Sequence, residues 1–207
     1  MASPPDSMPA IRTATSGEWV HSPLNRRQFL RAGCAVASMV VLSPLLVRPA
    51  YAALAGKPTR SIALANLHTG EACTLTYWEQ GTYIPEALAT ISRVLRDHRT
   101  NEMHAMDPAL LDLLTALLGR LETKAPFEVI SGYRSPQSNA LMHGRSAGVA
   151  SKSLHMQGKA IDVRVTNRSL TLVHNTALAM GLGGVGYYPT SGFVHVDTGR
   201  IRHWEGA

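Results

Sequence analysis

The stretch SLHMQGKAIDVRV, residues 153–165, decides the fold because its second half predicts a β-strand with two different faces. Over residues 160–165 every second residue is Ile or Val, and side chains two positions apart on a strand share a face. Ile161 and the two valines therefore face a core, whereas Asp162 and Arg164 face the other way. The Asp162 carboxylate is then available for chemistry, for a strand-end cap or for an ion pair with Arg164.

The stretch FVHVD, residues 193–197, alternates in the same way. His195 and Asp197 share one face, and the two valines face the core. His155 lies on the loop that leads into the first strand, so two imidazoles and the Asp162 carboxylate can meet on one side of a sheet. Three protein ligands with an open fourth position are typical of catalytic zinc. A single histidine is more often structural or exposed, so the pattern indicates a possible metal site without proving one.

Most of the chain after residue 58 follows helical or strand patterns, with apolar residues at helical spacing or in alternation. Residues 144–153 are rich in Gly, Ala and Ser and are expected to form a surface loop. Because helices come early and most strands late, the sequence predicts the α+β class with a central antiparallel sheet. The expected elements are a hairpin over 59–67 and 72–78, helices over 85–99, 108–121, 137–143 and 169–180, and strands over 127–130, 160–165, 184–188 and 192–198.

The N-terminal segment has the anatomy of an export signal. NRRQFLR, residues 25–31, precedes an apolar run over 32–47, and the small-x-small sequence AYA at 50–52 suits a signal peptidase. Adjacent arginines followed by Phe-Leu resemble a twin-arginine signal, which serves proteins exported already folded. The apolar run is short for a membrane anchor. We therefore expect a signal peptide over 1–52, a single mature domain over 53–207, a periplasmic location and no stable membrane span after processing.

The charge distribution argues against a nucleic-acid partner. The formal net charge is +6, with five Lys and Arg against two Asp and Glu through Ala52 and fifteen against twelve in the remainder. The mature part is thus only mildly basic, and it has no basic stripe interleaved with aromatic residues. Of the two cysteines only Cys73 remains after cleavage, so no intramolecular disulfide is expected.

Three motifs carry a resemblance to a known family: SGYRS at 131–135, SLHMQGKAID at 153–162 and GFVHVDTG at 192–199. Together they resemble the zinc murein peptidases related to D-alanyl-D-alanine carboxypeptidases and to the hedgehog signalling domain, and more closely the YcbK-like group of MepK-like murein endopeptidases. The resemblance covers about residues 60–204. It implies a fold of that family with helices packed on one side of the sheet, Zn²⁺ as cofactor and peptidoglycan as substrate, with endopeptidase favoured over carboxypeptidase action.

Residue roles follow from the resemblance position by position. It implies that His155, Asp162 and His195 are the zinc ligands and that Arg134 holds the substrate carbonyl oxygen or the oxyanion that develops from it. A guanidinium suits this role because it stays charged. From the residues alone, the favoured interpretation of Arg134 is a loop arginine paired with a surface carboxylate.

For several further residues near the motifs, the sequence allows two interpretations of their role. Ser153 and Gln137 fall at motif positions, where they either hydrogen bond to a ligand or substrate or shape the loop. Tyr187, Tyr188 and Trp204 are either core aromatics or a platform for sugar and peptide.

One departure from the family pattern concerns the general base. Many relatives carry Glu or Asp three residues before the last zinc histidine, or a second His two before it, and this chain has Gly192 and Phe193 there. Asp197 is the nearest carboxylate of the pattern. It either accepts a proton from the attacking water or orients the ring of His195. The missing acid also leaves an alternative function, a catalytically inactive peptidoglycan-binding module of the same fold.

Overall fold

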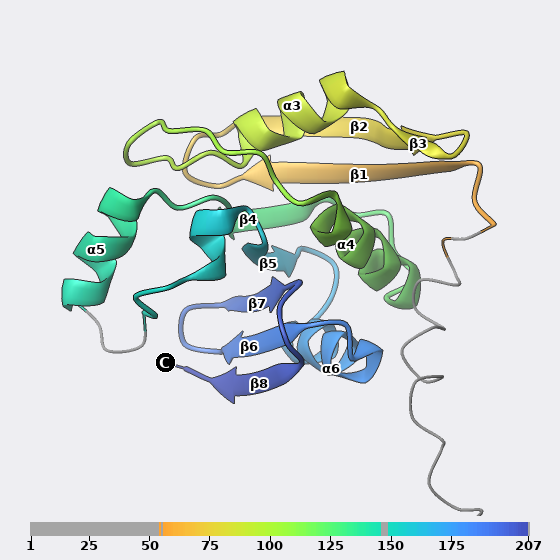
Figure 1. The fold of residues 1–207 in the computed structure, drawn as a ribbon. Helices are drawn as coiled ribbons and strands as arrows, with labels where there is room; N and C mark the ends of the chain where they lie inside the picture. The colour runs from red at the N-terminus through yellow and green to blue at the C-terminus, as the bar shows by residue number, and fades with distance from the viewer. Residues whose placement is uncertain (1–53, 55, 146–148, 207) are drawn as a thin grey trace, which may run out of the picture. The chain divides into compact units, whose positions relative to one another are not determined.

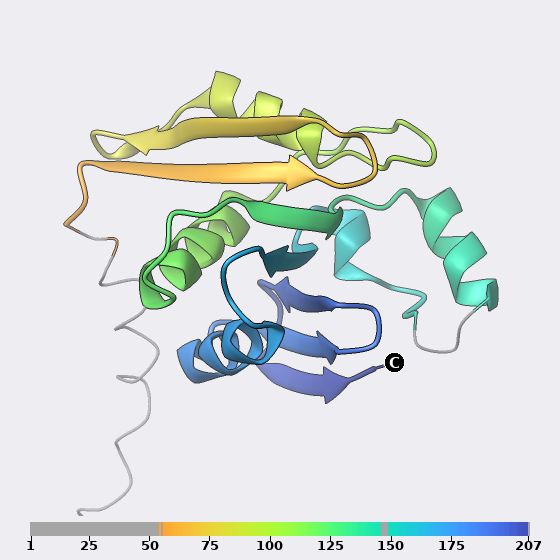
Figure 2. The same ribbon diagram turned by 180° about the vertical axis from the view of Figure 1, so that it is seen from behind.

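The computed structural model describes residues 54, 56–145 and 149–206, so the predicted leader over 1–52 lies outside them. One eight-stranded sheet runs through the described residues in the order β3-β2-β1-β4-β5-β7-β6-β8 (Figures 1 and 2). The strands are β1 (Thr59–Asn66), β2 (Ala72–Glu79), β3 (Thr82–Tyr83), β4 (Phe127–Ser131), β5 (Ala160–Val165), β6 (Gly184–Tyr188), β7 (Phe193–Asp197) and β8 (Arg202–Glu205). The helices are α3 (Pro85–Val94), α4 (Pro108–Arg120), α5 (Pro136–Arg145) and α6 (Leu170–Met180), with a short 3-10 helix η1 (Leu154–Gln157).

The α+β class predicted from the sequence is confirmed, and the strand directions refine it. β1 runs parallel to β4 and β6 runs parallel to β8, whereas the other neighbouring strands pair antiparallel. The sheet is therefore mixed. Parallel strands need a crossover connection, and the β2–β3 segment with α3 and α4 supplies one between β1 and β4.

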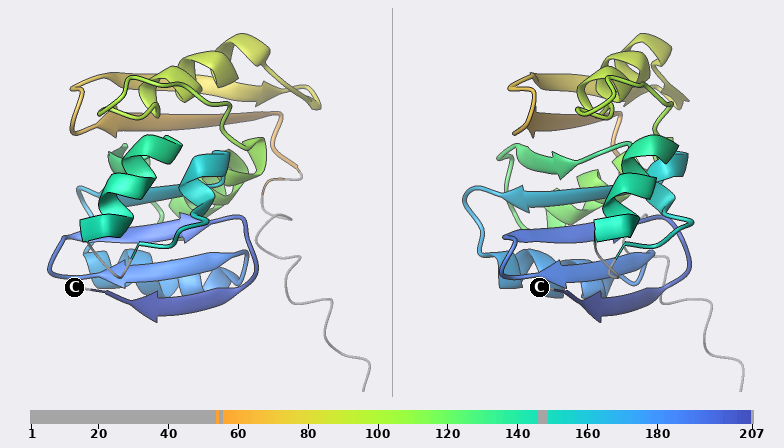
Figure 3. Two further views of the ribbon diagram at one scale, coloured as in Figure 1. Left: turned by 60° about the vertical axis from the view of Figure 1, so that its left-hand side comes forward. Right: turned by 90° about the vertical axis from the view of Figure 1, so that its left-hand side faces the viewer.

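Helices α3, α4 and α6 pack on the apolar face of the sheet. α3 contacts β1 and β2, α4 contacts β1 and α6, and α6 contacts β5, β6 and β7. Alternation along the strands directs buried apolar residues toward these helices. The buried strand residues of this core include Ile62, Leu64, Phe127, Val129, Ile161, Val163, Val185, Val194 and Val196. Figure 3 shows α5 on the other side of the strands from α6. The strand residues that alternate with this core therefore point toward the side on which α5 lies.

Helix α3 ends at Val94, although the sequence predicted it to continue to residue 99. The carbonyl oxygen of Leu95 accepts a hydrogen bond from the backbone N–H of Tyr133 at 2.7 Å. Gly132 packs so closely here that an added Cβ would lie 2.4 Å from the same oxygen. The chain leaves the helix because a loop distant in sequence uses the carbonyl group at its end.

The segment before β5 is more ordered than the predicted surface loop. α5 continues to Arg145, and residues 154–157 form η1. The Ser153 side chain caps η1 by accepting a hydrogen bond from the His155 N–H, and Gly158 ends it with φ of 65°. An added Cβ at Gly158 would lie 2.3 Å from the Ala105 carbonyl oxygen, so glycine is needed there for both conformation and space.

Candidate metal centre

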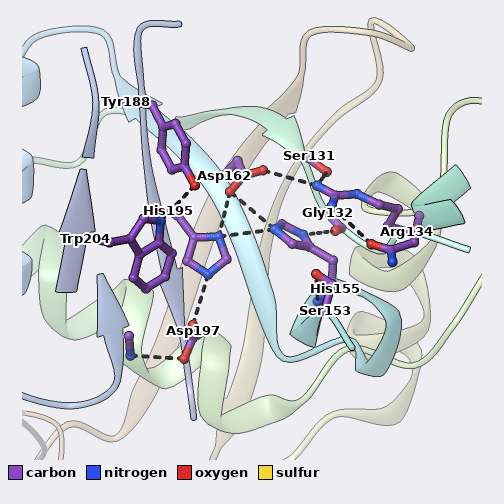
Figure 4. Close-up of polar contacts among 12 residues, drawn as sticks. Ser131, Gly132, Arg134, Ser153, His155, Asp162, Tyr188, His195, Asp197 and Trp204 are labelled. Carbon is purple, nitrogen blue, oxygen red and sulfur yellow. Dashed lines mark hydrogen bonds and ion pairs between the residues drawn. The ribbon is translucent and has the colours of Figure 1, made fainter. Parts of the chain in front are cut away.

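Three side chains from three elements converge on the polar side of the sheet (Figure 4). Asp162 on β5 lies directly opposite His195 on β7, and His155 comes from η1. Asp162 Oδ1 lies 2.8 Å from His195 Nδ1 and 3.3 Å from His155 Nε2, and the two ring nitrogens are 3.2 Å apart. One possible ligand atom from each residue lies within 4.8 Å of the others. The described residues thus contain a His/Asp/His cluster that could hold a metal ion.

Hydrogen bonding on one side of the His155 ring turns Nε2 toward the cluster. The opposite nitrogen, Nδ1, lies 2.7 Å from the carbonyl oxygen of Gly132. A carbonyl oxygen only accepts hydrogen bonds, so Nδ1 carries the proton and the lone pair is on Nε2. The His155 carbonyl oxygen in turn accepts from the backbone N–H of Arg134 at 3.3 Å. One contact through the ring and one through the backbone thus tie His155 to the SGYRS segment.

His195 presents its other nitrogen to the cluster. Its Nε2 lies 3.0 Å from Asp197 Oδ2, so this N–H donates to the Asp197 carboxylate, and Nδ1 lies 2.8 Å from Asp162 Oδ1 as the nitrogen that faces the cluster. Asp197 is fully buried and also accepts hydrogen bonds from Gly184 N, Gly199 N and two nitrogens of Arg202. Burial raises the pKa of Asp197, but the hydrogen bonds from His195 and Arg202 outweigh it and hold that pKa below its ordinary value. Asp197 is therefore an ionised carboxylate, and it contacts Nε2 of His195, the ring nitrogen that points away from the cluster.

Two glycines on β6 make room for this arrangement. Gly184 and Gly186 pair with Arg202 and Trp204 on β8. A Cβ added at Gly184 would lie 2.4 Å from a nitrogen of Arg202, and one at Gly186 would lie 2.6 Å from the indole of Trp204. Side chains from β8 thus reach across β6 to β7, where the Trp204 ring centroid lies 5.1 Å from that of His195.

Arg134 lies beside the cluster from the loop after β4. Its side chain is buried, with Nη2 at 3.7 Å from Asp162 Oδ2 and 3.4 Å from Ser131 Oγ. Its Nη1 lies 3.5 Å from Asn139 Oδ1, and Nε has no hydrogen-bond partner among the described residues. Burial lowers the pKa of Arg134, and the Asp162 carboxylate opposes that effect. The loop-arginine reading, with a surface carboxylate as partner, does not fit a buried guanidinium.

The cluster is electrostatically suited to a cation. Burial raises the pKa of Asp162, but the charges of the two imidazoles and their hydrogen bonds outweigh it and hold that pKa far below its ordinary range. Burial also lowers the pKa of His155. For His195, burial lowers the pKa, but hydrogen bonds to Asp162 and Asp197 raise it overall to about 9. An ionised carboxylate between two buried imidazoles favours positive charge at their common centre.

The other residues singled out from the sequence have distinct places. Ser153 caps η1, so it shapes the loop that carries His155. Gln137 is exposed on the first turn of α5. Asn139, two positions later, is buried and donates to the carbonyl oxygens of Ala150 and Ser151 while facing Arg134. Sequence reasoning missed Asn139, because only the contact between α5 and the following loop shows its role.

Sequence reasoning also missed Arg202 and the two β6 glycines. A local signal existed, since Gly184-x-Gly186 and Arg202-x-Trp204 both have the period of a strand. Nothing in the sequence said that β8 would pair with β6.

Comparison with known proteins identifies the family. A family model described as peptidoglycan L,D-endopeptidase MepK matches residues 54–204. The chain belongs to the MepK family. The peptidoglycan L,D-endopeptidase MepK of Escherichia coli (strain K12) is 42% identical over 180 residues, covering 87% of this chain and 97% of the relative. A probable peptidoglycan L,D-endopeptidase MepK of Haemophilus influenzae is 37% identical over 183 residues, covering 88% and 96%.

Membership of the MepK family confirms the resemblance carried by the three motifs. The matched range contains the whole His/Asp/His cluster and also Arg134, Asp197 and the β8 residues that contact them. The chain is thus a peptidase of this family with a group of side chains able to bind a metal.

Proposed function

We propose that this protein is a zinc-dependent peptidoglycan hydrolase that cuts an amide bond in murein stem peptides or cross-links as an endopeptidase. The observation that carries the proposal is the convergence of His155 Nε2, Asp162 Oδ1 and His195 Nδ1 on one point. The names of the relatives support an amide bond between an L- and a D-configured residue as the target.

The donor atoms fit zinc. Two imidazole nitrogens and one carboxylate oxygen form a three-ligand set of the kind found in catalytic zinc sites, where a bound metal would replace the protons shared between the rings and Asp162. Each imidazole has its far nitrogen hydrogen bonded, to Gly132 O in His155 and to Asp197 in His195, which fixes the tautomer that a metal ligand needs. Zinc bound there would supply a Lewis acid that lowers the pKa of a coordinated water and polarises the amide carbonyl.

Arg134 stabilises the negative charge that develops on the scissile carbonyl oxygen. Its buried guanidinium keeps a position beside Asp162, and its unpartnered Nε shows that the donors of this group are not all used within the described residues. A fixed cation in a poorly hydrated site stabilises charge more effectively than the same cation in water.

Asp197 orients His195 and does not act as the general base. It contacts Nε2, the nitrogen on the far side of the ring from Asp162, and its own oxygens are occupied by Arg202 and two backbone N–H groups. These contacts support the orienting role among the two that the sequence left open.

Digestion of purified cross-linked peptidoglycan tests the proposal. The purified protein should contain about one zinc ion per chain, release peptides that mass analysis assigns to cleaved stem amides or cross-links, and stop doing so after chelation. His195→Ala should lose both zinc and activity, whereas His203→Ala, an exposed histidine on β8, should keep both. Absence of bound zinc, or full digestion by the His195→Ala variant, would sink the proposal.

The alternative is a peptidoglycan-binding module without catalysis. It is motivated by Gly192 and Phe193, which stand where many relatives carry an acid or a second histidine. A protein that sediments with peptidoglycan and binds zinc but releases no fragment would establish this alternative in place of the first.

We further propose export to the periplasm by a twin-arginine signal over residues 1–52. The RRQFL sequence and a wall substrate support it. As a separate finding, none of the helices in the described part of the chain has the length and apolar character of a membrane span. Replacing Arg26 and Arg27 together by Lys should leave the full-length protein in the cytoplasmic fraction, as shown by fractionation and immunoblotting. Unchanged periplasmic recovery of the variant would reject this route.

A further inference from the structure

Tyr188 lies at the edge of the metal centre, at the end of β6. It pairs with Phe193 on β7, and the two rings stack with centroids 4.5 Å apart. Because Phe193 is two residues before His195, this pair shares the sheet face that carries the ligands. Figure 4 shows the Tyr188 hydroxyl directed toward Asp162 and His195. The residue is half-buried, so part of it remains accessible to solvent.

Trp204 fixes the direction of the Tyr188 hydroxyl. The indole Nε1–H donates to Tyr188 Oη at 2.8 Å. An indole nitrogen only donates, so the tyrosine oxygen is the acceptor and its own hydrogen points elsewhere. Among the described residues that hydrogen has no acceptor. The indole is held in turn by the space that Gly186 leaves and by the guanidinium of Arg202, 4.9 Å from its ring centroid.

A second hydrogen-bond donor, in addition to Arg134, can reach the carbonyl oxygen that reacts at this site. Arg134 approaches Asp162 from the loop after β4, whereas Tyr188 approaches it from β6 (Figure 4). Neither Gly192 nor Phe193 offers a polar side chain in the segment before His195. A phenol with a free proton and an indole donating into its oxygen is a stronger donor than an isolated phenol, since linked hydrogen bonds polarise one another.

We propose that Tyr188 is a catalytic residue whose hydroxyl donates a hydrogen bond to the carbonyl oxygen of the scissile amide as charge develops there, with Trp204 as the positioning residue. This inference rests on the proposed peptidase function. The proton stays on Tyr188 throughout, so the residue stabilises charge and exchanges no proton with the substrate. The competing role is a purely aromatic one, in which the ring packs against Phe193 and the substrate and the hydroxyl is dispensable.

The variant Tyr188→Phe separates the two roles because it keeps the ring. Its matched control is Tyr187→Phe, since Tyr187 lies on the opposite face of β6, hydrogen bonded to Thr171 and stacked on His174 of α6. Loss of one donor to an oxyanion is expected to lower kcat about 100-fold. KM, bound zinc and the thermal midpoint should stay at parent values, and Tyr187→Phe should keep kcat as well.

A second readout uses binding alone. A phosphinic analogue of the cross-linked stem dipeptide carries a tetrahedral anion where the oxyanion forms, so its affinity should fall with kcat/KM in Tyr188→Phe. Calorimetry on the zinc-loaded proteins measures this. Trp204→Phe, which keeps an aromatic ring but removes the N–H, should weaken analogue binding and kcat about 10-fold with zinc content unchanged.

The results for Tyr188→Phe distinguish the catalytic role of the hydroxyl from a structural one. A parent enzyme that is active together with a Tyr188→Phe variant of undiminished kcat and analogue affinity overturns the inference and leaves the peptidase function intact. Loss of zinc or of folding in Tyr188→Phe, or a rise in KM alone, also overturns it, because the residue would then be structural. An inactive parent refutes the peptidase function itself.

Discussion

The two histidines of the cluster offer different nitrogens, and this difference follows from the acceptor that each ring has behind it. His155 donates through Nδ1 to a backbone carbonyl, and His195 donates through Nε2 to Asp197. A backbone carbonyl is fixed by the fold, but a carboxylate needs its own support. Arg202 supplies that support with two nitrogens at 2.7 and 3.1 Å from Asp197 oxygens. The orientation of His195 therefore depends on a chain of side chains, and a substitution can test it.

Asp197→Asn should weaken zinc binding about 10- to 100-fold, as substitutions behind metal-ligating histidines do. The carboxylate accepts five hydrogen bonds on two oxygens, but the amide has one acceptor oxygen and its NH2 group would face other donors. The side chain behind the His195 ring therefore loses its support. Competition with a chromophoric chelator measures the affinity. Arg202→Ala should act in the same direction, and exposed Arg200→Ala should have no effect. If Asp197 were the general base instead, kcat would collapse while zinc affinity stayed at the parent value.

Strand β8 contacts β7 across β6 because Gly184 and Gly186, on β6, have no side chains to stand between the two strands. Gly186 offers the clearest test of this arrangement, since an added Cβ would lie 2.6–2.8 Å from three atoms of the rigid indole of Trp204. Gly186→Ala should lower the free energy of unfolding by about 1–3 kcal/mol through overpacking and should reduce activity by displacing Trp204. Urea denaturation measures the first effect. Gly119→Ala is the matched control: nothing lies within 4 Å of its added Cβ, so it should be neutral or stabilising by about 0.5–1 kcal/mol as a helical glycine.

A buried carboxylate in the turn after α3 should make the stability of the fold depend on pH. Asp97 is buried and accepts hydrogen bonds from the backbone N–H groups of Ser135 and Arg99, which holds the segment that carries Arg134. Burial raises the pKa of Asp97, but the nearby side chains of Ser138 and Ser135 and the backbone N–H groups of Ser135 and Arg99 outweigh it and leave that pKa below its ordinary value of 3.8. A lowered carboxyl pKa stabilises the fold above pH 3.8, and that stability is lost as the pH falls below it.

Asp97→Asn should accordingly cost about 1–3 kcal/mol of unfolding free energy at pH 7. The gap between the parent and the variant should be constant from pH 7 to about pH 4 and should shrink below that. Urea titrations between pH 3 and pH 7 measure both curves. A gap that stays the same throughout this range would show that the charge of Asp97 contributes nothing.

The elements differ in how far the sequence could predict them. Alternation within β5 and β7 placed Asp162 and His195 on a polar face correctly, because strand periodicity is a local property. The end of α3 at Val94 and the 3-10 turn around His155 depend on Leu95 O and Ala105 O meeting residues far along the chain. The pairing of β8 with β6 is equally non-local. Local pattern therefore predicted which side chains face the cluster, and tertiary contacts determined which nitrogen each histidine presents to it.

At the scale of the molecule, the proposed ligands join η1, β5 and β7, so zinc should act as a cross-link of the folded state. A ligand that binds only the native protein stabilises it by about 2.7 kcal/mol at a free concentration 100 times its dissociation constant. Chelation should therefore lower the thermal midpoint, and added zinc should restore it, as calorimetry would measure. His195→Ala should start from the lower midpoint and gain nothing from zinc, because the remaining two ligands come from a single segment, residues 155–162. A midpoint that is the same with and without chelator in the parent would mean that the cluster holds no metal, and that its three side chains only pair with one another.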